Sequence, residues 1–217
     1  MSNLATCVGP GWLWQPFRMA SDLPPLVVAN VGAWRRWLDK HHAQSIGVWL
    51  LLSKQGTTHP TSLTYDEALE EALRYGWIDG QLRRADDTTY SRRFTPRRAR
   101  SAWSKRNVAI IERLIGEGRM HPAGLAEVER AQADGRWDAA YAGSKSIEVP
   151  ADFAAALRAD PRAQAMFQKL SSQNRYAFLY RIETAKRPDT RSRRIGQFVE
   201  MLARGETLHP EGGTRSR

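Results

Sequence analysis

The sequence predicts an α+β fold, in which a small sheet with flanking helices is followed by a C-terminal helical bundle. Two observations on the order of the elements predict it. Strand-like segments occur only between residues 46 and 94, whereas helical periodicity of apolar residues dominates residues 103–204. Composition adds a third observation, because 41% of the 217 residues are hydrophobic, which suffices for a sizeable buried core.

The first predicted elements are a helix, a strand and a second helix. Residues 31–42 carry apolar side chains at helical spacing, and the continuous apolar run at residues 46–52 has the character of a buried strand. The second helix starts clearly, because Thr64 and Glu67 have the spacing of a capping box. Gly76 is placed to end it.

Two short strands follow, at residues 77–80 and 88–94, with a polar turn over residues 83–87 between them. Helices are predicted from there onward, beginning with residues 103–115, for which either Ser101 or Ser104 is the N-cap. Further helices are predicted at residues 123–133, 150–159, 161 onward, 172–186 and 189–204.

The elements divide the chain into an α/β module at residues 25–142 and a helical module at residues 150–204. The small and polar segment 143–149 is the predicted linker. Residues 1–24 are expected to form an irregular N-terminal extension, in which Met19 is a candidate initiator, and residues 205–217 a disordered tail.

Charge is the most telling feature of the composition. The chain has 33 Lys and Arg residues against 23 Asp and Glu residues, a net charge of +10. This surplus favours an anionic ligand or surface as partner and keeps nucleic acid among the candidates. No segment is long and apolar enough to span a bilayer, and residues 1–20 lack the pattern of a secretory signal, so we expect a cytoplasmic protein.

The residue types needed for several kinds of catalysis are missing or scattered. The single cysteine, Cys7, is peripheral, and the five histidines are dispersed, so we expect no metal site and no cofactor. The sequence has no Gly-x-Ser-x-Gly turn and neither of the two common glycine-rich phosphate loops. We therefore assign no catalytic residue, and the sequence does not determine the oligomeric state.

An arginine-rich segment at residues 79–107 is the first candidate site. Arg93 and Arg97, together with a helix N-terminus capped by Ser101 or Ser104, could hold a phosphate or carboxylate. The alternative is that the serine only caps the helix and the arginines are solvated or paired with acids.

A pocket beside that loop is the second candidate. Its predicted lining residues are Trp77, Asp79, Tyr90 and Trp103. Asp79 could equally hold a turn, or form a buried ion pair with Arg93 or Arg97, and these readings favour a structural role over catalysis.

A basic stripe is the third candidate. Arg187, Arg191 and Arg194 fall at i, i+4 and i+7 of a helix and could follow the phosphates of a nucleic acid. The alternative is ordinary solvated arginine that complements a helix C-terminus.

Several short segments form a recognisable combination: Gly76–Gly80, Arg93–Arg97, Ser101–Ser104 with Asn107, Gly118–Met120 with Pro122, Ala123 and Gly124, Pro150–Leu157, Ala185–Lys186, Thr190–Arg191 and Arg194–Ile195. With these segments the chain resembles the YdeI/OmpD-associated, or bacteriocin-protection, family over residues 23–204. The resemblance implies protection against bacteriocins or cationic antimicrobial peptides and carries no assigned catalytic residues.

The functional prediction is a non-enzymatic stress or antimicrobial-peptide protection protein with a basic, anion-binding surface. One alternative is a sequence-independent nucleic-acid binder that uses the basic stripe. The other is a small-molecule enzyme, which requires a closed pocket that joins Trp77, Asp79 and Arg97.

Overall fold

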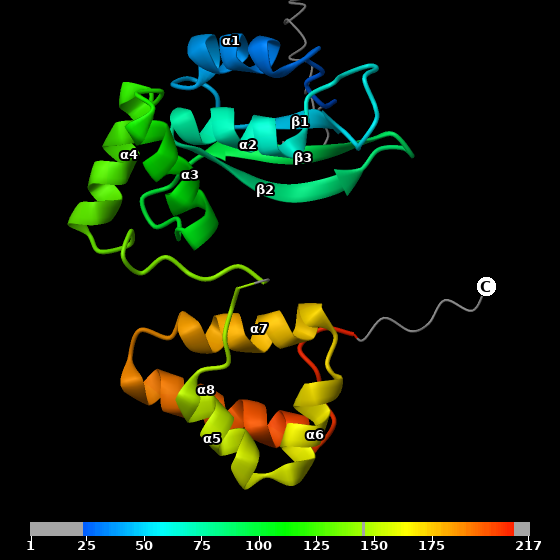
Figure 1. Ribbon diagram of the computed structural model, residues 1–217, viewed down its shortest axis with the longest axis vertical. Helices are drawn as coiled ribbons and strands as arrows, with labels where there is room; N and C mark the ends of the chain where they lie inside the picture. Colours follow the sequence, from blue (N-terminus) through cyan, green and yellow to red (C-terminus); the bar gives the residue numbers. More distant parts are fainter. Residues whose placement is uncertain (1–23, 145, 211–217) are drawn as a thin grey trace, which may run out of the picture.

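The computed structural model describes residues 24–144 and 146–210, and it confirms the predicted fold class. A three-stranded sheet with helices is followed by a separate helical bundle (Figure 1). We call these the α/β part and the helical part. The predicted N-terminal extension up to residue 23, and residues 211–217 of the predicted tail, lie outside the described residues.

The sheet is antiparallel throughout, with strand order β1-β3-β2. Its strands are β1 (Val48–Ser53), β2 (Trp77–Arg84) and β3 (Thr89–Pro96). Residue 26 adds a parallel bridge to Leu50, on the edge of β1 that does not face β3. The central strand of the sheet is therefore β3, which carries Arg92 and Arg93.

Strand boundaries differ from the prediction for local reasons. The first strand starts at Val48 rather than residue 46, because Ile46 is 80% exposed and Gly47 has a left-handed φ of 127°. The second strand runs beyond Gly80 to Arg84, since pairing with β3 resumes at Leu82 after an irregularity that follows Asp79. A polar, exposed hairpin end carries no apolar pattern from which this extension could be predicted.

Four helices complete the α/β part: α1 (Val31–His41), α2 (Tyr65–Arg74), α3 (Lys105–Gly116) and α4 (Pro122–Ala133). Figure 1 shows α1 stacked over α2, α2 against the sheet, and α3 and α4 at one end of the sheet. The capping box of Thr64 and Glu67 is present as predicted. Ser104 caps α3 by accepting from Asn107 N, so Ser101 lies in the preceding loop and is not the N-cap.

Tryptophans anchor the core of the α/β part. Trp34 and Trp77 are fully buried with Phe94 in one cluster, and Trp34 Nε1 donates to the Ala68 carbonyl at 3.1 Å. A second cluster joins α2, α3 and α4 around the fully buried Trp103. Burial of an indole contributes a large apolar area, so these residues fix how the helices lie on the sheet.

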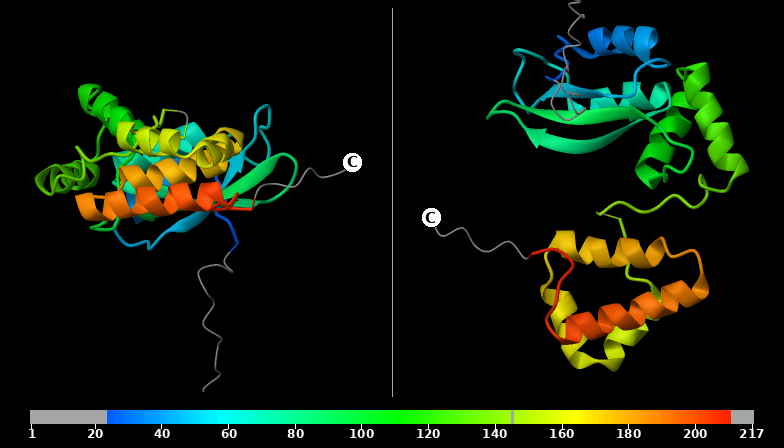
Figure 2. Two further views of the ribbon diagram at one scale, coloured as in Figure 1. Left: turned by 90° about the horizontal axis from the view of Figure 1, so that it is seen from below. Right: turned by 180° about the vertical axis from the view of Figure 1, so that it is seen from behind.

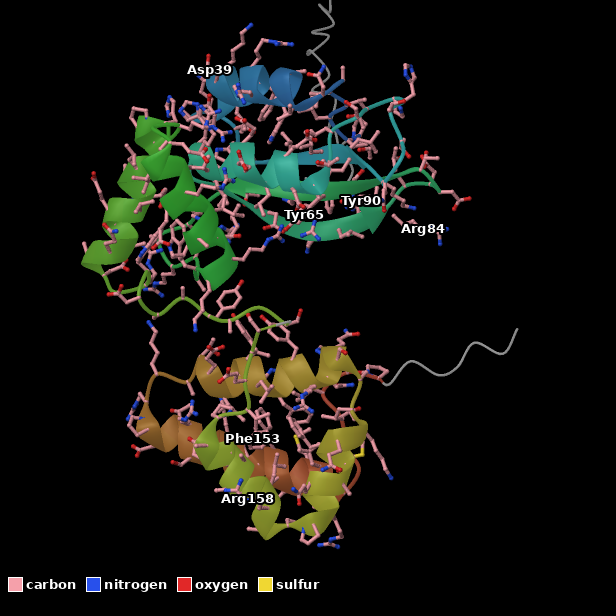
Figure 3. The ribbon with its side chains drawn as sticks, in the orientation of Figure 1. Asp39, Tyr65, Arg84, Tyr90, Phe153 and Arg158 are labelled. Carbon is pink, nitrogen blue, oxygen red and sulfur yellow. The ribbon has the colours of Figure 1, made fainter. Side chains whose placement is uncertain are left out.

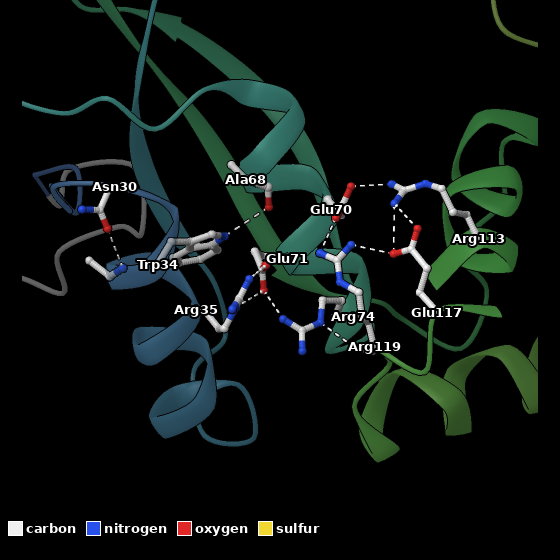
Figure 4. Close-up of polar contacts among 11 residues, drawn as sticks. Asn30, Trp34, Arg35, Ala68, Glu70, Glu71, Arg74, Arg113, Glu117 and Arg119 are labelled. Atoms are coloured by element: carbon white, nitrogen blue, oxygen red, sulfur yellow. Dashed lines mark hydrogen bonds and ion pairs between the residues drawn. The ribbon is translucent and has the colours of Figure 1, made fainter. Parts of the chain in front are cut away.

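An ion-pair network on α2 ties the helices together (Figure 4). Glu71 is 1% exposed and binds Arg35 and Arg74, each at 2.6 Å. Its neighbour Glu70 binds Arg113 at 2.5 Å and Arg119 at 2.6 Å. The two carboxylates on α2 therefore link α1, α3 and the loop before α4.

The helical part consists of α5 (Ala151–Ala159), α6 (Pro161–Lys169), α7 (Ser172–Glu183) and α8 (Pro188–Ala203). Its core is a cluster of its own, with edge-on phenylalanine pairs between α5 and α6 and between α7 and α8. In Figures 1 and 2, this part lies on the side of the sheet opposite α1, and α7 is its element nearest to the α/β part.

The end of the described chain packs against the helical part. Asn174 exchanges two hydrogen bonds of 2.9 Å with the backbone of His209, and Leu208 packs against the core. Residues 205–210 therefore differ from the disordered tail predicted from Gly205 onward.

Candidate functional site

The cavity with the clearest chemistry lies where the two parts of the chain meet. It has a volume of about 470 Å³, within the range of small-molecule sites. One wall comes from residues 100–105 and 136–141, and the other from residues 180–186. The lining residues that matter for the chemistry below are Trp103, Lys105, Tyr141, Tyr180, Glu183 and Lys186.

Backbone pairing fixes the first wall. Tyr141 N donates to the Trp103 carbonyl and Lys105 N donates to the Tyr141 carbonyl, both at 2.9 Å. The loop before α3 and the segment after α4 are therefore held side by side. This pairing orients the Trp103 ring and places Lys105 at the first position of α3.

A small set of contacts joins the two walls. The Tyr141 and Tyr180 rings meet edge to face with centroids 5.0 Å apart. Ala142 N donates to the Glu183 carboxylate at 3.3 Å, and the Tyr176 hydroxyl donates to the Ala142 carbonyl at 3.4 Å. Burial raises the pKa of Tyr141, so its phenol keeps its proton at neutral pH.

Arg97 lies directly behind the first wall and is 5% exposed. Its guanidinium carbon is 3.5 Å from the centroid of the Trp103 ring, and Nη1 donates to the Ala102 carbonyl at 3.2 Å. Within the described part of the chain, Nε and Nη2 have no hydrogen-bond partner and no carboxylate pairs with this cation. Burial lowers the pKa of Arg97 to about 10, because the charged form is deprived of water.

The lining of the cavity is positive on balance. Four of the lining side chains are cationic and two are acidic: Arg100, Lys105, Arg136 and Lys186, against Asp138 and Glu183. Of the cations, Arg136 is occupied, since it pairs with Asp134 at 2.7 Å and donates to the Ser101 carbonyl at 3.0 Å. Together with the charge of Arg97 behind the wall, the arrangement favours an anionic occupant with an apolar portion that contacts the aromatic rings.

The structure separates the other predicted site residues from this cavity. Trp77 is a core residue whose Nε1 donates to the His42 carbonyl at 3.2 Å. Asp79 accepts from the Tyr65 hydroxyl at 3.0 Å and pairs with Arg92, so its partner is neither Arg93 nor Arg97.

Tyr90 and Arg93 also lie away from Arg97 and Trp103. Tyr90 lines a separate groove on the β2–β3 hairpin, and Arg93 lies opposite Trp49 on β3, beside a small apolar cavity near Ile46. The cavities that contain Trp103, Tyr90 and Arg93 are three separate ones, and none of them is lined by Trp77, Asp79 or Arg97.

The basic stripe is largely engaged within the helical part. Arg191 forms a two-pronged ion pair with Asp152 at 2.6 and 2.9 Å and donates to the Ile182 carbonyl at 2.9 Å. Arg194 donates to the Arg181 carbonyl at 2.5 Å, and Arg187 is the N-cap residue of α8. These contacts hold α8 against α5 and α7.

Sequence reasoning missed the second wall of the cavity. Tyr180 and Lys186 of this wall are far along the chain from Tyr141 of the first wall, and nothing in the local pattern of these three residues distinguishes them from core or solvated residues. The one available signal was Tyr141 itself, a large aromatic residue in the otherwise small and polar stretch that precedes the predicted linker.

Two family models match the chain. Residues 146–205 match the model described as "Bacteriocin-protection, YdeI or OmpD-Associated", which confirms the predicted family resemblance for the helical part. Residues 26–127 match a different model, described as a domain of unknown function, so the predicted span of 23–204 for the first family was too wide. No curated protein and no solved structure matches the chain.

Two further findings concern membranes and metals. None of the helices in the described ranges is long and apolar enough to cross a membrane. Among the same residues, no group of three or more His, Cys, Asp or Glu side chains is arranged to hold a metal ion.

Proposed function

We propose that this protein is a cytoplasmic, non-enzymatic binding protein with a role in bacteriocin protection, and that it binds a small anion in the cavity between its two parts. The single observation that carries the proposal is Arg97, a buried cation with two unpartnered donor nitrogens behind a cavity wall. Among the described residues no carboxylate forms an ion pair with this buried charge, although Glu127 attracts it from farther away. An unpaired buried charge is costly, so its retention beside a cavity fits electrostatic binding of an anion.

The proposal treats residues 25–142 and 150–204 as two domains that share one site. Their cores are separate clusters, and the cavity takes Lys105 from one side and Lys186 from the other. An anion held between these ammonium groups would draw the two domains together.

A protective role through direct capture of cationic peptides is disfavoured. The chain has a net charge of +10, and like charges repel over the distance at which proteins meet. Protection would instead depend on an anionic metabolite that the protein senses or sequesters.

The two alternatives from the sequence lose support. Nucleic-acid binding by the basic stripe would require Arg191 and Arg194 to leave partners within their own domain. An enzyme pocket around Trp77, Asp79 and Arg97 has no counterpart in the described part of the chain, because Trp77 belongs to the core and Asp79 pairs with Arg92.

The proposal is tested by thermal unfolding of the wild-type protein in the presence of phosphate, succinate and benzoate at matched ionic strength. A specific anion stabilises the folded state by mass action, and this rise in Tm is expected to disappear in Lys186→Glu. The matched control is Arg158→Glu, which changes the same charge on an exposed position of α5. Equal shifts in wild type and Lys186→Glu would reject the cavity as the site.

A further inference from the structure

A second cavity lies on the β2–β3 hairpin and shares no lining residue with the cavity between the two parts. We call it the hairpin groove. Its volume is about 380 Å³, and its lining residues are Lys54, Tyr65, Leu82, Arg84, Tyr90 and Arg92. Figure 3 labels Tyr65 at the start of α2, and Tyr90 and Arg84 on the neighbouring hairpin.

Every charged side chain that lines the hairpin groove is a cation. Arg92 is balanced by Asp79, with which it forms an ion pair. Lys54, by contrast, donates to the backbone carbonyls of Asp86 and Asp87 at 2.8 and 3.1 Å and forms no ion pair with a carboxylate of the described residues. Among the side chains that line the groove, the hairpin end therefore has an excess of positive charge, with the carboxylates of Asp86 and Asp87 in the adjacent turn.

Arg84 adds to that excess because its own ion pair is weak. It meets Asp87 at 3.1 Å, with the two side chains 80% and 93% exposed. Exposed pairs of this kind contribute little and exchange readily with other partners. Lys54 and Arg84 can thus both reach a multiply charged anion at the hairpin end of the groove.

The rest of the lining is aromatic and apolar apart from Arg92, and Tyr90 lies opposite Arg84 in the strand register. Tyr65 is held by its hydrogen bond to Asp79 at 3.0 Å, and the Arg92 guanidinium lies over its ring at 4.5 Å. Tyr90 presents a half-buried ring beside Leu82, whose apolar side chain is 56% exposed. Arg92 Nε is buried and has no acceptor among the described residues. A flat, partly polar ring would cover this apolar surface.

We infer that the hairpin groove binds a nucleotide, with the base against Tyr90 and Leu82 and the phosphate between Lys54 and Arg84. A phosphomonoester carries nearly two negative charges at neutral pH, so it competes better than a single carboxylate for Lys54 and for the weakly paired Arg84. The volume admits one nucleotide unit. That unit could be a free mononucleotide or one residue of a single strand, since both present the same chemistry.

Binding is measured by isothermal titration of the full-length protein with adenosine 5′-monophosphate, with adenosine, and with an oligothymidylate of about 12 nucleotides. We expect the monophosphate to bind at least about tenfold more tightly than adenosine, because only the monophosphate engages Lys54 and Arg84. Tighter binding of the oligonucleotide, with an affinity that falls steeply with salt, would assign the site to single strands. The opposite order would assign it to free nucleotides.

Two pairs of variants locate the site. Tyr90→Ala is expected to lower the affinity about tenfold or more, whereas Tyr90→Phe, which keeps the ring, should stay within about twofold of wild type. Arg84→Glu should lower it about tenfold without disturbing the fold, because that side chain is 80% exposed. Arg158→Glu is its charge-matched control.

The outcome separates this inference from the proposed function. Lys186→Glu, in the cavity between the two parts, should leave nucleotide binding unchanged. Absence of binding by both nucleotide probes would overturn the inference, and so would binding that Arg84→Glu and Tyr90→Ala leave intact. A loss confined to Lys186→Glu would place the nucleotide in the other cavity and overturn it equally.

Discussion

Replacement of Arg97 by methionine should make the protein more stable and at the same time weaken anion binding. Burial lowers the pKa of the guanidinium from the ordinary arginine value to about 10, and at 1.36 kcal/mol per pKa unit the charged form is penalised by about 3 kcal/mol. The cation also lies 3.5 Å from the Trp103 ring, a contact that stabilises by about 2 kcal/mol when desolvated. Arg97→Met should therefore raise the free energy of unfolding by about 1 kcal/mol.

The same replacement removes a positive charge behind the cavity wall. An anion about 8 Å from the guanidinium is attracted to it by about 2 kcal/mol at an effective dielectric constant of about 20. Loss of this attraction in Arg97→Met should lower the affinity for the anion about 30-fold. The sign of the stability change also follows from proton linkage. Below about pH 10 the guanidinium is charged in the folded and the unfolded state and carries the full penalty, which is relieved only as the pH rises above the folded pKa of about 10 toward the ordinary pKa of arginine.

Urea unfolding at pH 7 and isothermal titration with the anion that most raises Tm measure the two effects. For a chain of 217 residues, 1 kcal/mol corresponds to roughly 2–4 °C in Tm. Arg158→Met is the control, and it should change neither quantity by more than about 0.5 kcal/mol. A variant Arg97→Met that is less stable by more than about 1 kcal/mol and binds the anion normally would refute the reasoning, because the guanidinium would then be a structural element.

Three further predictions concern the α/β part. Glu71→Gln should destabilise the fold by about 3–5 kcal/mol in urea unfolding, since it leaves the charges of Arg35 and Arg74 without their buried carboxylate; a loss below about 1 kcal/mol would contradict this. Gly76→Ala should cost at least about 1–2 kcal/mol by the same assay, because φ is 74° and the new Cβ would lie 2.7 Å from Glu127 Cγ; unchanged stability would mean the turn can relax. Burial alone would raise the pKa of Glu70, but hydrogen bonds from Arg113 and Arg119 lower it, so the stability that the carboxylate contributes is present above its unfolded pKa and is lost as the pH falls below about 4.5. Glu70→Gln should therefore reduce the loss of stability with falling pH in this range. An unchanged pH dependence would contradict the role of Glu70.

Local patterns in the sequence predicted most of the fold. The capping box at Thr64 and Glu67, the Asp160 N-cap before a proline and the periodicity of residues 31–42 each depend on neighbours within one turn, and all three are present.

The end of α7 was misplaced by three residues, because the helical pattern continues to Lys186 while α7 ends at Glu183. Arg187, which precedes a proline, is extended and serves instead as the N-cap of α8.

The candidate site was predicted only in part, because it depends on contacts between distant segments. Arg97 and Trp103 are close in the sequence and were both predicted to be site residues, and in the structure the guanidinium stacks on the indole ring. Their joining with Tyr180 and Lys186 depends on how the helical part lies against the α/β part, about which local pattern carries no information. Likewise, Arg92, Arg93 and Arg97 are all possible ion-pair partners of Asp79 by sequence. The register of β2 against β3 determines that the partner is Arg92.

The most direct test of the cavity between the two parts is isothermal titration of its preferred anion against wild type, Lys105→Glu and Lys186→Glu. These residues lie on opposite walls, so a bridging anion predicts that each charge reversal weakens binding about tenfold or more, while Arg158→Glu leaves it unchanged. Binding that depends on one lysine alone, or on neither, would contradict the claim that the two parts of the chain share a single anion site.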